Sequence, residues 1–124
     1  MVPMFELYKR FRFEAAHVLK HHNGKCGRPH GHSYELIVYL RSNTLCAEGS
    51  STNMVIDFSD ISAMVEPMIE QYLDHHWLND TLQCESPTAE FIAQWIYQHL
   101  KPNIPLLDRV TLSETPSSSV TYSE

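Results

Sequence analysis

Residues 32–42 of the 124-residue chain read HSYELIVYLRS. Apolar side chains recur there at every second position, through Tyr34, Leu36, Val38 and Leu40. Because successive side chains of a strand point to opposite faces of its sheet, this spacing predicts a β-strand with one buried face. The fold is therefore expected to rest on a sheet, and the flanking segments indicate which strands join it.

A second strand is predicted over residues 4–14, where only Lys9 interrupts the apolar series. Between the two strands, residues 18–29 read VLKHHNGKCGRP and contain two glycines, an Asn-Gly pair and a proline, which indicates a loop. We expect the two strands to pair through this long loop, which would bring their inner ends together. The positions expected on the buried face of the earlier strand are Phe5, Leu7, Phe11 and Phe13.

Two amphipathic helices are predicted in the middle of the chain, because apolar residues recur there every three or four positions. The first covers roughly residues 59–72, with Asp57 or Ser59 as its N-cap. The second covers about residues 87–100, with Ser86 as N-cap and a proline at the first helical position.

Residues 108–115 and 119–123 have the pattern of a closing hairpin. The order of elements is then strand, strand, helix, helix, strand, strand. This order predicts a single α+β domain over residues 1–124, with a four-stranded antiparallel sheet that carries two helices on one face.

The formal net charge of −6 disfavours general binding to nucleic acid or to an anionic membrane. Residues 1–41 nevertheless hold seven Lys and Arg against three acids, which suits either a small anionic ligand or merely a polar surface. The three cysteines, Cys26, Cys46 and Cys84, form no CxxC pair and suit a reducing compartment. Without a signal-peptide core or a membrane-length apolar run, the chain is expected to be soluble and cytoplasmic.

Five of the eight histidines fall between residues 17 and 32. His30 and His32 open one predicted strand, and residues two apart in a strand share a face. His17 ends the facing strand, so antiparallel pairing would bring it beside them. Three imidazoles with an open fourth position are the pattern of a catalytic zinc site. The alternative is a set of hydrogen-bonded histidines without a metal.

Cys26 lies four residues before His30, within the glycine-rich stretch GKCGRPHGH. Lys25, Arg28 and a nearby metal would favour its thiolate form, which suits a nucleophile or a general base. An unreactive loop cysteine is the alternative.

Asp74 and His75 are adjacent within LDHHWLND, and a carboxylate beside an imidazole can act as an acid–base dyad. A helix-end aspartate followed by a solvated histidine is the alternative. Beyond Asp108 at its start, the predicted strand 108–115 contains a single acid, Glu114. A planar ligand with two N–H donors would satisfy the hydrogen-bonding capacity of this carboxylate. An exposed edge-strand glutamate is the alternative there.

Six motifs occur in a fixed order over nearly the whole chain: FEAAH, CGRPHGHS, VIDFSD, LDHHWLND, SPTAEF and LSETPSSSVTY. Together they resemble the 6-pyruvoyl-tetrahydropterin synthase family. The C-x-x-x-H-G-H spacing is most similar to the family's queuosine-pathway branch, which forms 6-carboxy-5,6,7,8-tetrahydropterin. The sequence departs from the family's pattern just before VIDF, where members often have a glycine and this chain has Asn53. Asparagine tolerates the positive φ that glycine adopts.

The resemblance implies a tunnelling fold (T-fold) whose subunits assemble into an oligomeric barrel, typically a hexamer, with active sites at subunit interfaces. It implies conversion of 7,8-dihydroneopterin triphosphate with release of acetaldehyde and triphosphate. The pyruvoyl-forming reaction on the same substrate and a non-catalytic zinc or pterin binder are the alternatives. The implied roles are zinc ligands for His17, His30 and His32, catalytic base for Cys26, proton transfer for Asp74 and His75, and pterin binding for Glu114 and Thr88.

Overall fold

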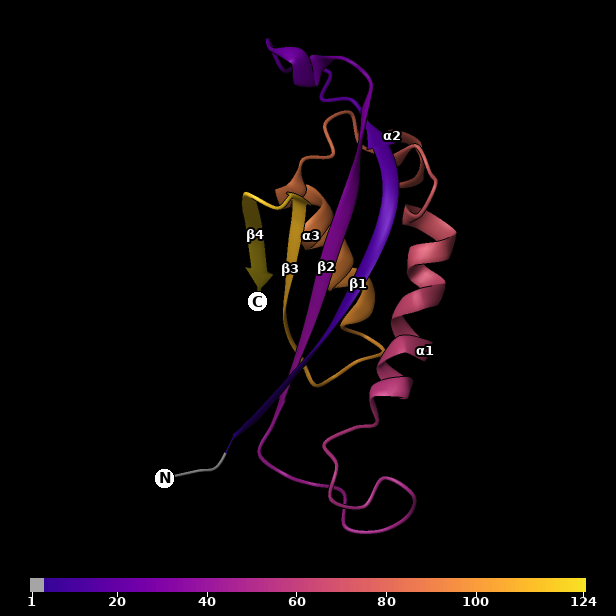
Figure 1. Ribbon diagram of the computed structural model, residues 1–124, viewed down its shortest axis with the longest axis vertical. Coiled ribbons are helices and arrows are strands. Elements are labelled where there is room, and N and C mark those ends of the chain that lie inside the picture. Colours follow the sequence, from indigo (N-terminus) through magenta and orange to yellow (C-terminus); the bar gives the residue numbers. More distant parts are fainter. Residues whose placement is uncertain (1–3) are drawn as a thin grey trace.

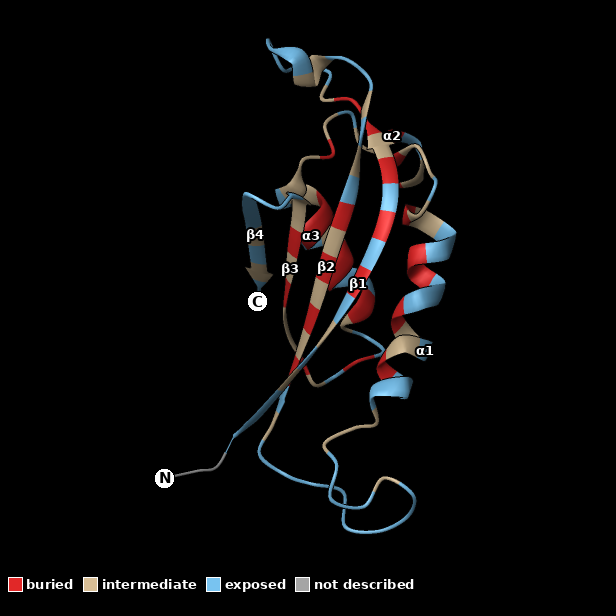
Figure 2. Cartoon of the chain, in the orientation of Figure 1, coloured by how far each residue is buried: buried red, intermediate tan, exposed pale blue. Residues whose placement is uncertain are grey.

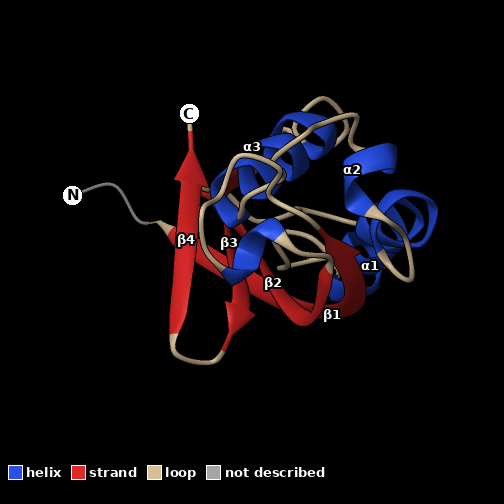
Figure 3. Ribbon diagram, turned by 90° about the horizontal axis from the view of Figure 1, so that it is seen from above, coloured by secondary structure: helices blue, strands red, loops and turns tan. Residues whose placement is uncertain are grey.

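A computed structural model describes residues 4–124 as a four-stranded sheet with a layer of helices on one face (Figures 1 and 3). The sheet is antiparallel, and its strands are ordered β1-β2-β3-β4, as in the chain. This architecture confirms the α+β fold with helices on one face of a four-stranded sheet. The strands are β1 Phe5–His17, β2 His30–Ser42, β3 Leu107–Thr115 and β4 Ser118–Ser123.

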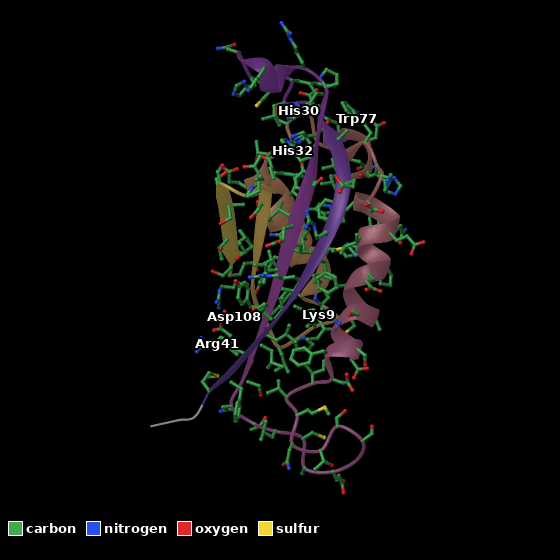
Figure 4. The ribbon with its side chains drawn as sticks, in the orientation of Figure 1. Lys9, His30, His32, Arg41, Trp77 and Asp108 are labelled. Carbon is green, nitrogen blue, oxygen red and sulfur yellow. The ribbon has the colours of Figure 1, made fainter. Side chains whose placement is uncertain are left out.

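The pairing of β1 with β2 is in continuous register from Phe5 opposite Ser42 to His17 opposite His30. Both strands are longer than predicted, and Lys9 does not interrupt β1. Its side chain reaches the helix layer, where the amine donates to the Phe58 carbonyl at 3.1 Å (Figure 4).

The first half of β1 differs from its predicted burial. Phe11 and Phe13 are buried, but Leu7 is only half-buried and Phe5 is 40% exposed. Figure 1 shows the cause: the start of β1 runs beyond the end of the helix layer, so no helix covers its apolar side. The alternation of apolar residues therefore predicts the strand correctly but overstates how much of it is buried.

The first predicted helix is present as α1 (Phe58–Met68), followed by a π-helical turn, η2 (Ile69–Leu73). Asp57 is the N-cap, since its carboxylate accepts from the Ser59 N–H at 2.8 Å. The π-helical turn closes with the Asp74 N–H donating to the Ile69 carbonyl at 2.7 Å. Sequence periodicity predicts the helix but not this change of winding.

The second predicted helix, α3 (Ala89–Leu100), begins two residues later than expected. Its N-cap is Thr88, whose hydroxyl accepts from the Phe91 N–H at 3.1 Å, so the prediction of Ser86 as N-cap is wrong. Pro87 stays outside the helix, and its carbonyl binds a histidine of β1 instead. Two short elements were not predicted: η1 (Lys25–Gly27) and α2 (Leu78–Thr81).

The core lies between the sheet and the helices (Figure 2). Fully buried side chains come from every layer, among them Leu36 of β2, Val65 of α1 and Ile96 of α3. Asn53 adopts φ 65°, as expected for a residue that stands in for glycine. In the described residues, no helix combines the length and apolar character required to cross a membrane.

Candidate active site

Three histidines meet where β1 ends and β2 begins. His17 and His30 are paired across the two strands, and His32 lies two residues further on the same face of β2 (Figure 4). The nearest ring nitrogens of the three residues lie within 4.8 Å of one another, and His17 Nε2 is 2.9 Å from His30 Nε2. The predicted clustering of these imidazoles is therefore confirmed.

Backbone carbonyl groups set the tautomers of two of these rings. His17 Nδ1–H donates to the Pro87 carbonyl at 2.8 Å, and His30 Nδ1–H donates to the Arg28 carbonyl at 2.7 Å. With the proton on Nδ1, each Nε2 presents a lone pair. This arrangement is the one by which proteins orient histidine ligands toward a metal.

The chemistry of the cluster fits a bound cation. Two Nε2 lone pairs that face each other repel unless a proton or a cation lies between them. Protonation of His17 is disfavoured because burial lowers its pKa, although the Pro87 hydrogen bond and the Glu114 charge partly oppose that effect. Burial also lowers the pKa of His32. Neutral imidazoles are the form that binds zinc, so the cluster could hold this ion.

Glu114 of β3 reaches the same cluster, a proximity that the sequence does not indicate. Its Oε2 lies 3.3 Å from His17 Nε2 and 3.4 Å from His32 Nε2. The buried Tyr34 hydroxyl donates to the same oxygen at 3.5 Å, and burial together with this carboxylate raises the pKa of Tyr34. Glu114 therefore places an anionic oxygen beside the nitrogen lone pairs of the cluster. This negative charge further favours a bound cation.

A pocket of about 310 Å³ opens beside Glu114, between β3, β4 and the start of α3. Ala89, Glu90 and Ser119 contribute to its lining. Thr88 precedes the lining residue Ala89 in the chain but does not itself line the pocket, and its hydroxyl is engaged as the cap of α3. Glu114 thus separates the histidine cluster from a pocket that could receive a ligand.

Cys26 lies in η1, within the loop that projects beyond the sheet (Figure 1). The loop is closed by hydrogen bonds, including the Leu19 N–H to the Cys26 carbonyl at 3.0 Å. A Cβ atom at Gly27 would lie 2.5 Å from the His22 carbonyl oxygen, so only glycine fits there without a shift. The Cys26 side chain is half-buried and, over residues 4–124, has no hydrogen bond to the histidine cluster.

Asp74 and His75 form the predicted pair, with His75 Nδ1 2.9 Å from Asp74 Oδ2. Asp74 Oδ1 also accepts from the Glu14 N–H at 2.9 Å, and these bonds lower its pKa. His75 adopts φ 59°, an uncommon conformation for a residue other than glycine. Between residues 4 and 124, no hydrogen bond joins this pair to the histidine cluster.

The pair belongs to a segment that runs along the outer edge of β1. The Ala16 N–H donates to the His76 carbonyl at 3.3 Å, and Ala16 forms a bridge with Trp77, which lies beside the end of β1 in Figure 4. A pocket of about 550 Å³, lined in part by Glu14, Ser33 and His75, opens at this edge. The dyad is thus presented at the surface of the protomer.

Sequence reasoning missed three groups that contact the cluster or the strand end that carries it: Tyr34, the Pro87 carbonyl and Asn79. Tyr34 follows His32 by two residues, so strand parity alone could have placed it on the same face. The other two contact β1 across more than sixty residues of chain, and no local pattern signals such contacts.

Comparison with known proteins identifies a family to which this chain is similar. The family model described as 6-pyruvoyl tetrahydropterin synthase matches residues 6–124. The chain belongs to this family.

Members of the 6-pyruvoyl tetrahydropterin synthase family match this chain over nearly its whole length. The 6-carboxy-5,6,7,8-tetrahydropterin synthase of Synechocystis sp. is 48% identical over 96% of this chain and 93% of its own. The synthase of the same name from Haemophilus influenzae is 37% identical over 98% of this chain and all of its own. The structure of Caenorhabditis elegans 6-pyruvoyl tetrahydropterin synthase aligns with a TM-score of 0.85 at 26% identity, covering 99% and 97% of the two chains.

Proposed function

We propose that this protein is a zinc-dependent 6-carboxy-5,6,7,8-tetrahydropterin synthase. It would convert 7,8-dihydroneopterin triphosphate to 6-carboxy-5,6,7,8-tetrahydropterin, with release of acetaldehyde and triphosphate, as a cytoplasmic step of queuosine biosynthesis. The observation that carries the proposal is the 48% identity to the Synechocystis synthase over 96% of the chain, joined to the three converging histidines.

His17, His30 and His32 would hold the zinc ion. When bound, zinc supplies Lewis acidity that polarises hydroxyl groups of the substrate side chain. Protein groups support this assignment: the Pro87 and Arg28 carbonyls fix the tautomers of two rings, so that Nε2 lone pairs point inward.

Glu114 would anchor the pterin ring, since a carboxylate accepts two parallel hydrogen bonds from adjacent N–H groups. Its position between the histidine cluster and the 310 Å³ pocket supports this role, and Thr88 lies nearby at the start of α3. The triphosphate would then extend toward the loop that carries Lys25 and Arg28.

Cys26 would act as the base that removes a proton from the substrate, and Asp74 with His75 would pass protons on. Within one protomer the dyad lies on the outer edge of β1, not hydrogen-bonded to the cluster or to Cys26. In an active site shared between subunits, the Asp74–His75 pair of one protomer would act on substrate bound at the histidine cluster of its neighbour.

Assembly of the protein into a barrel, typically a hexamer, would provide such shared sites. The sheet has two edge strands, β1 and β4, and segment 74–77 covers β1 only near its end. Unpaired strand edges favour pairing with another chain. Light scattering would test this by giving a mass of six times the 14.3 kDa of one chain.

The second candidate is the pyruvoyl-forming reaction on the same substrate, favoured by the name of the matching family model and by the fold of the Caenorhabditis elegans enzyme. Incubation of the zinc-loaded protein with 7,8-dihydroneopterin triphosphate, followed by chromatography of the pterins, separates the two. A 6-carboxy product supports the proposal, and a 6-pyruvoyl product refutes it. A protein that binds the pterin but never converts it would instead be a non-catalytic binder.

A further inference from the structure

Among the described residues, Asn79 and His17 are the buried side chains that are neither apolar nor tyrosine, and Asn79 is 8% exposed. It lies in the short helix α2 and bonds to Val18, the residue that follows the end of β1. Burial of an amide is unfavourable unless its donors and acceptor are all hydrogen-bonded. Asn79 meets this condition with three hydrogen bonds to backbone groups.

Two of these bonds hold the residue that follows His17. The Val18 N–H donates to Asn79 Oδ1 at 2.9 Å, and Asn79 Nδ2 donates to the Val18 carbonyl at 2.9 Å. The amide therefore pairs with Val18 as a neighbouring strand would, just where β1 ends. This pairing fixes the backbone from which the His17 side chain leaves.

The third bond holds the segment whose Pro87 carbonyl binds the His17 ring. Asn79 Nδ2 also donates to the Glu85 carbonyl at 3.1 Å, two residues before Pro87, whose carbonyl accepts from His17 Nδ1. The Glu85 carbonyl in addition accepts from the Lys20 N–H at 3.2 Å. One amide thus joins the strand end that carries His17 to the segment that binds its ring.

We propose that Asn79 is a positioning residue for the metal site, which sets the orientation of His17 by holding both backbone segments that support its ring. The inference rests on the His17–His30–His32 site of the proposed function. It assigns to Asn79 no contact with substrate or metal.

The test is Asn79→Asp, which keeps the shape of the side chain and the acceptor for the Val18 N–H. It removes both N–H donors and places a negative charge beside two carbonyl oxygens. The matched control is Thr81→Val on the same helix, which removes the 2.7 Å hydrogen bond from the Thr81 hydroxyl to the Tyr72 carbonyl, away from His17. Both variants lose hydrogen bonds from a side chain of α2 to backbone carbonyls, but only Asn79→Asp loses bonds to the segments beside His17.

Binding of Co²⁺ to the purified apoprotein is the readout, because its visible spectrum reports ligand geometry as well as affinity. We expect Asn79→Asp to bind Co²⁺ at least tenfold more weakly with an altered spectrum, as is typical when a ligand's support is lost. We expect Thr81→Val to match the wild type. Equal weakening in both variants, or an unchanged Asn79→Asp, would overturn the inference while leaving the proposed function intact. A wild type that binds no Co²⁺ or Zn²⁺ would refute the metal site itself, and this inference with it.

If Asn79→Asp does not fold, hydrogen exchange on the wild-type protein decides the matter. Because coupling between sites is reciprocal, metal binding at His17 should strengthen the Val18–Asn79 bond. Addition of Zn²⁺ should therefore slow exchange of the Val18 amide at least tenfold more than that of the Leu107 amide, which bonds to Ile104 at the other end of the sheet. Equal slowing at both amides contradicts the role proposed for Asn79.

Discussion

The carbonyl oxygen of Pro87 accepts a hydrogen bond from His17 Nδ1 over 2.8 Å, across 70 residues of chain. This bond orients the one fully buried imidazole of the candidate site and leaves its Nε2 without a proton, facing His30 and Glu114. It also accounts for the late start of α3, since a carbonyl turned toward β1 lies outside the helix. The orientation of His17 in the histidine cluster and the N-terminus of α3 are thus set by the same contact.

The histidine cluster predicts a clear result for metal content. His32→Ala removes one of the three proposed ligands and should abolish stoichiometric zinc binding, as measured by metal analysis of the purified protein. The control is His21→Ala, since His21 is exposed and pairs with Glu85 away from the cluster. An alanine variant at position 32 that retains as much zinc as the wild type would show that the metal lies elsewhere.

The role proposed for Cys26 predicts that its removal affects catalysis but not metal binding. Cys26→Ala should lose turnover by several orders of magnitude while still binding one zinc ion per chain, because the thiol is not part of the histidine cluster. Cys46→Ala is the matched control, since Cys46 is an exposed cysteine in the loop at the opposite end of the molecule (Figure 1). Full activity in Cys26→Ala would exclude the cysteine as the base.

Glu114→Gln tests the anchoring of the pterin. The amide has one acceptor atom and no charge, and hydrogen bonds to a charged group contribute about 1.5–3 kcal/mol each. The dissociation constant for the pterin, measured by calorimetry, should therefore rise roughly tenfold to a hundredfold. The variant should still bind zinc at saturating concentration, since the three histidines remain. A variant that binds pterin normally but has lost zinc would make Glu114 a metal ligand instead.

Much of this site could be predicted from the sequence. Strand parity puts His30 and His32 on one face, and antiparallel pairing through a single loop brings His17 opposite His30. Both are local rules, because they need only the period of one strand and the connection to the next. The four strands and two main helices follow from the same kind of periodicity.

The contacts that complete the site could not be predicted in this way. Glu114 approaches His17 because β3 pairs beside β2, and the Pro87 carbonyl binds the His17 ring from the segment before α3. Asn79 of α2 binds the backbone of the next residue, Val18. Such contacts depend on how whole layers pack, which the pattern of one segment does not encode. The start of α3 differs from its predicted position for the same reason, since a tertiary hydrogen bond keeps Pro87 out of the helix.

Asp74 predicts a specific sensitivity to acid. Hydrogen bonds from the Glu14 N–H and from His75 lower its pKa in the folded protein. A carboxylate with a lowered folded-state pKa stabilises the fold above its unfolded value, about 3.9, and this contribution is lost as the pH falls through the folded value. The stability difference between wild type and Asp74→Asn, from urea unfolding, should therefore shrink below about pH 4. A difference that stays constant from pH 6 to pH 3 would contradict this account.

The most direct test of the central claim is the amount of acetaldehyde formed by the zinc-loaded protein from 7,8-dihydroneopterin triphosphate. We expect one acetaldehyde for each substrate consumed, together with an equal amount of 6-carboxy-5,6,7,8-tetrahydropterin, and no product from His32→Ala. Consumption of the substrate without acetaldehyde would contradict the proposed activity.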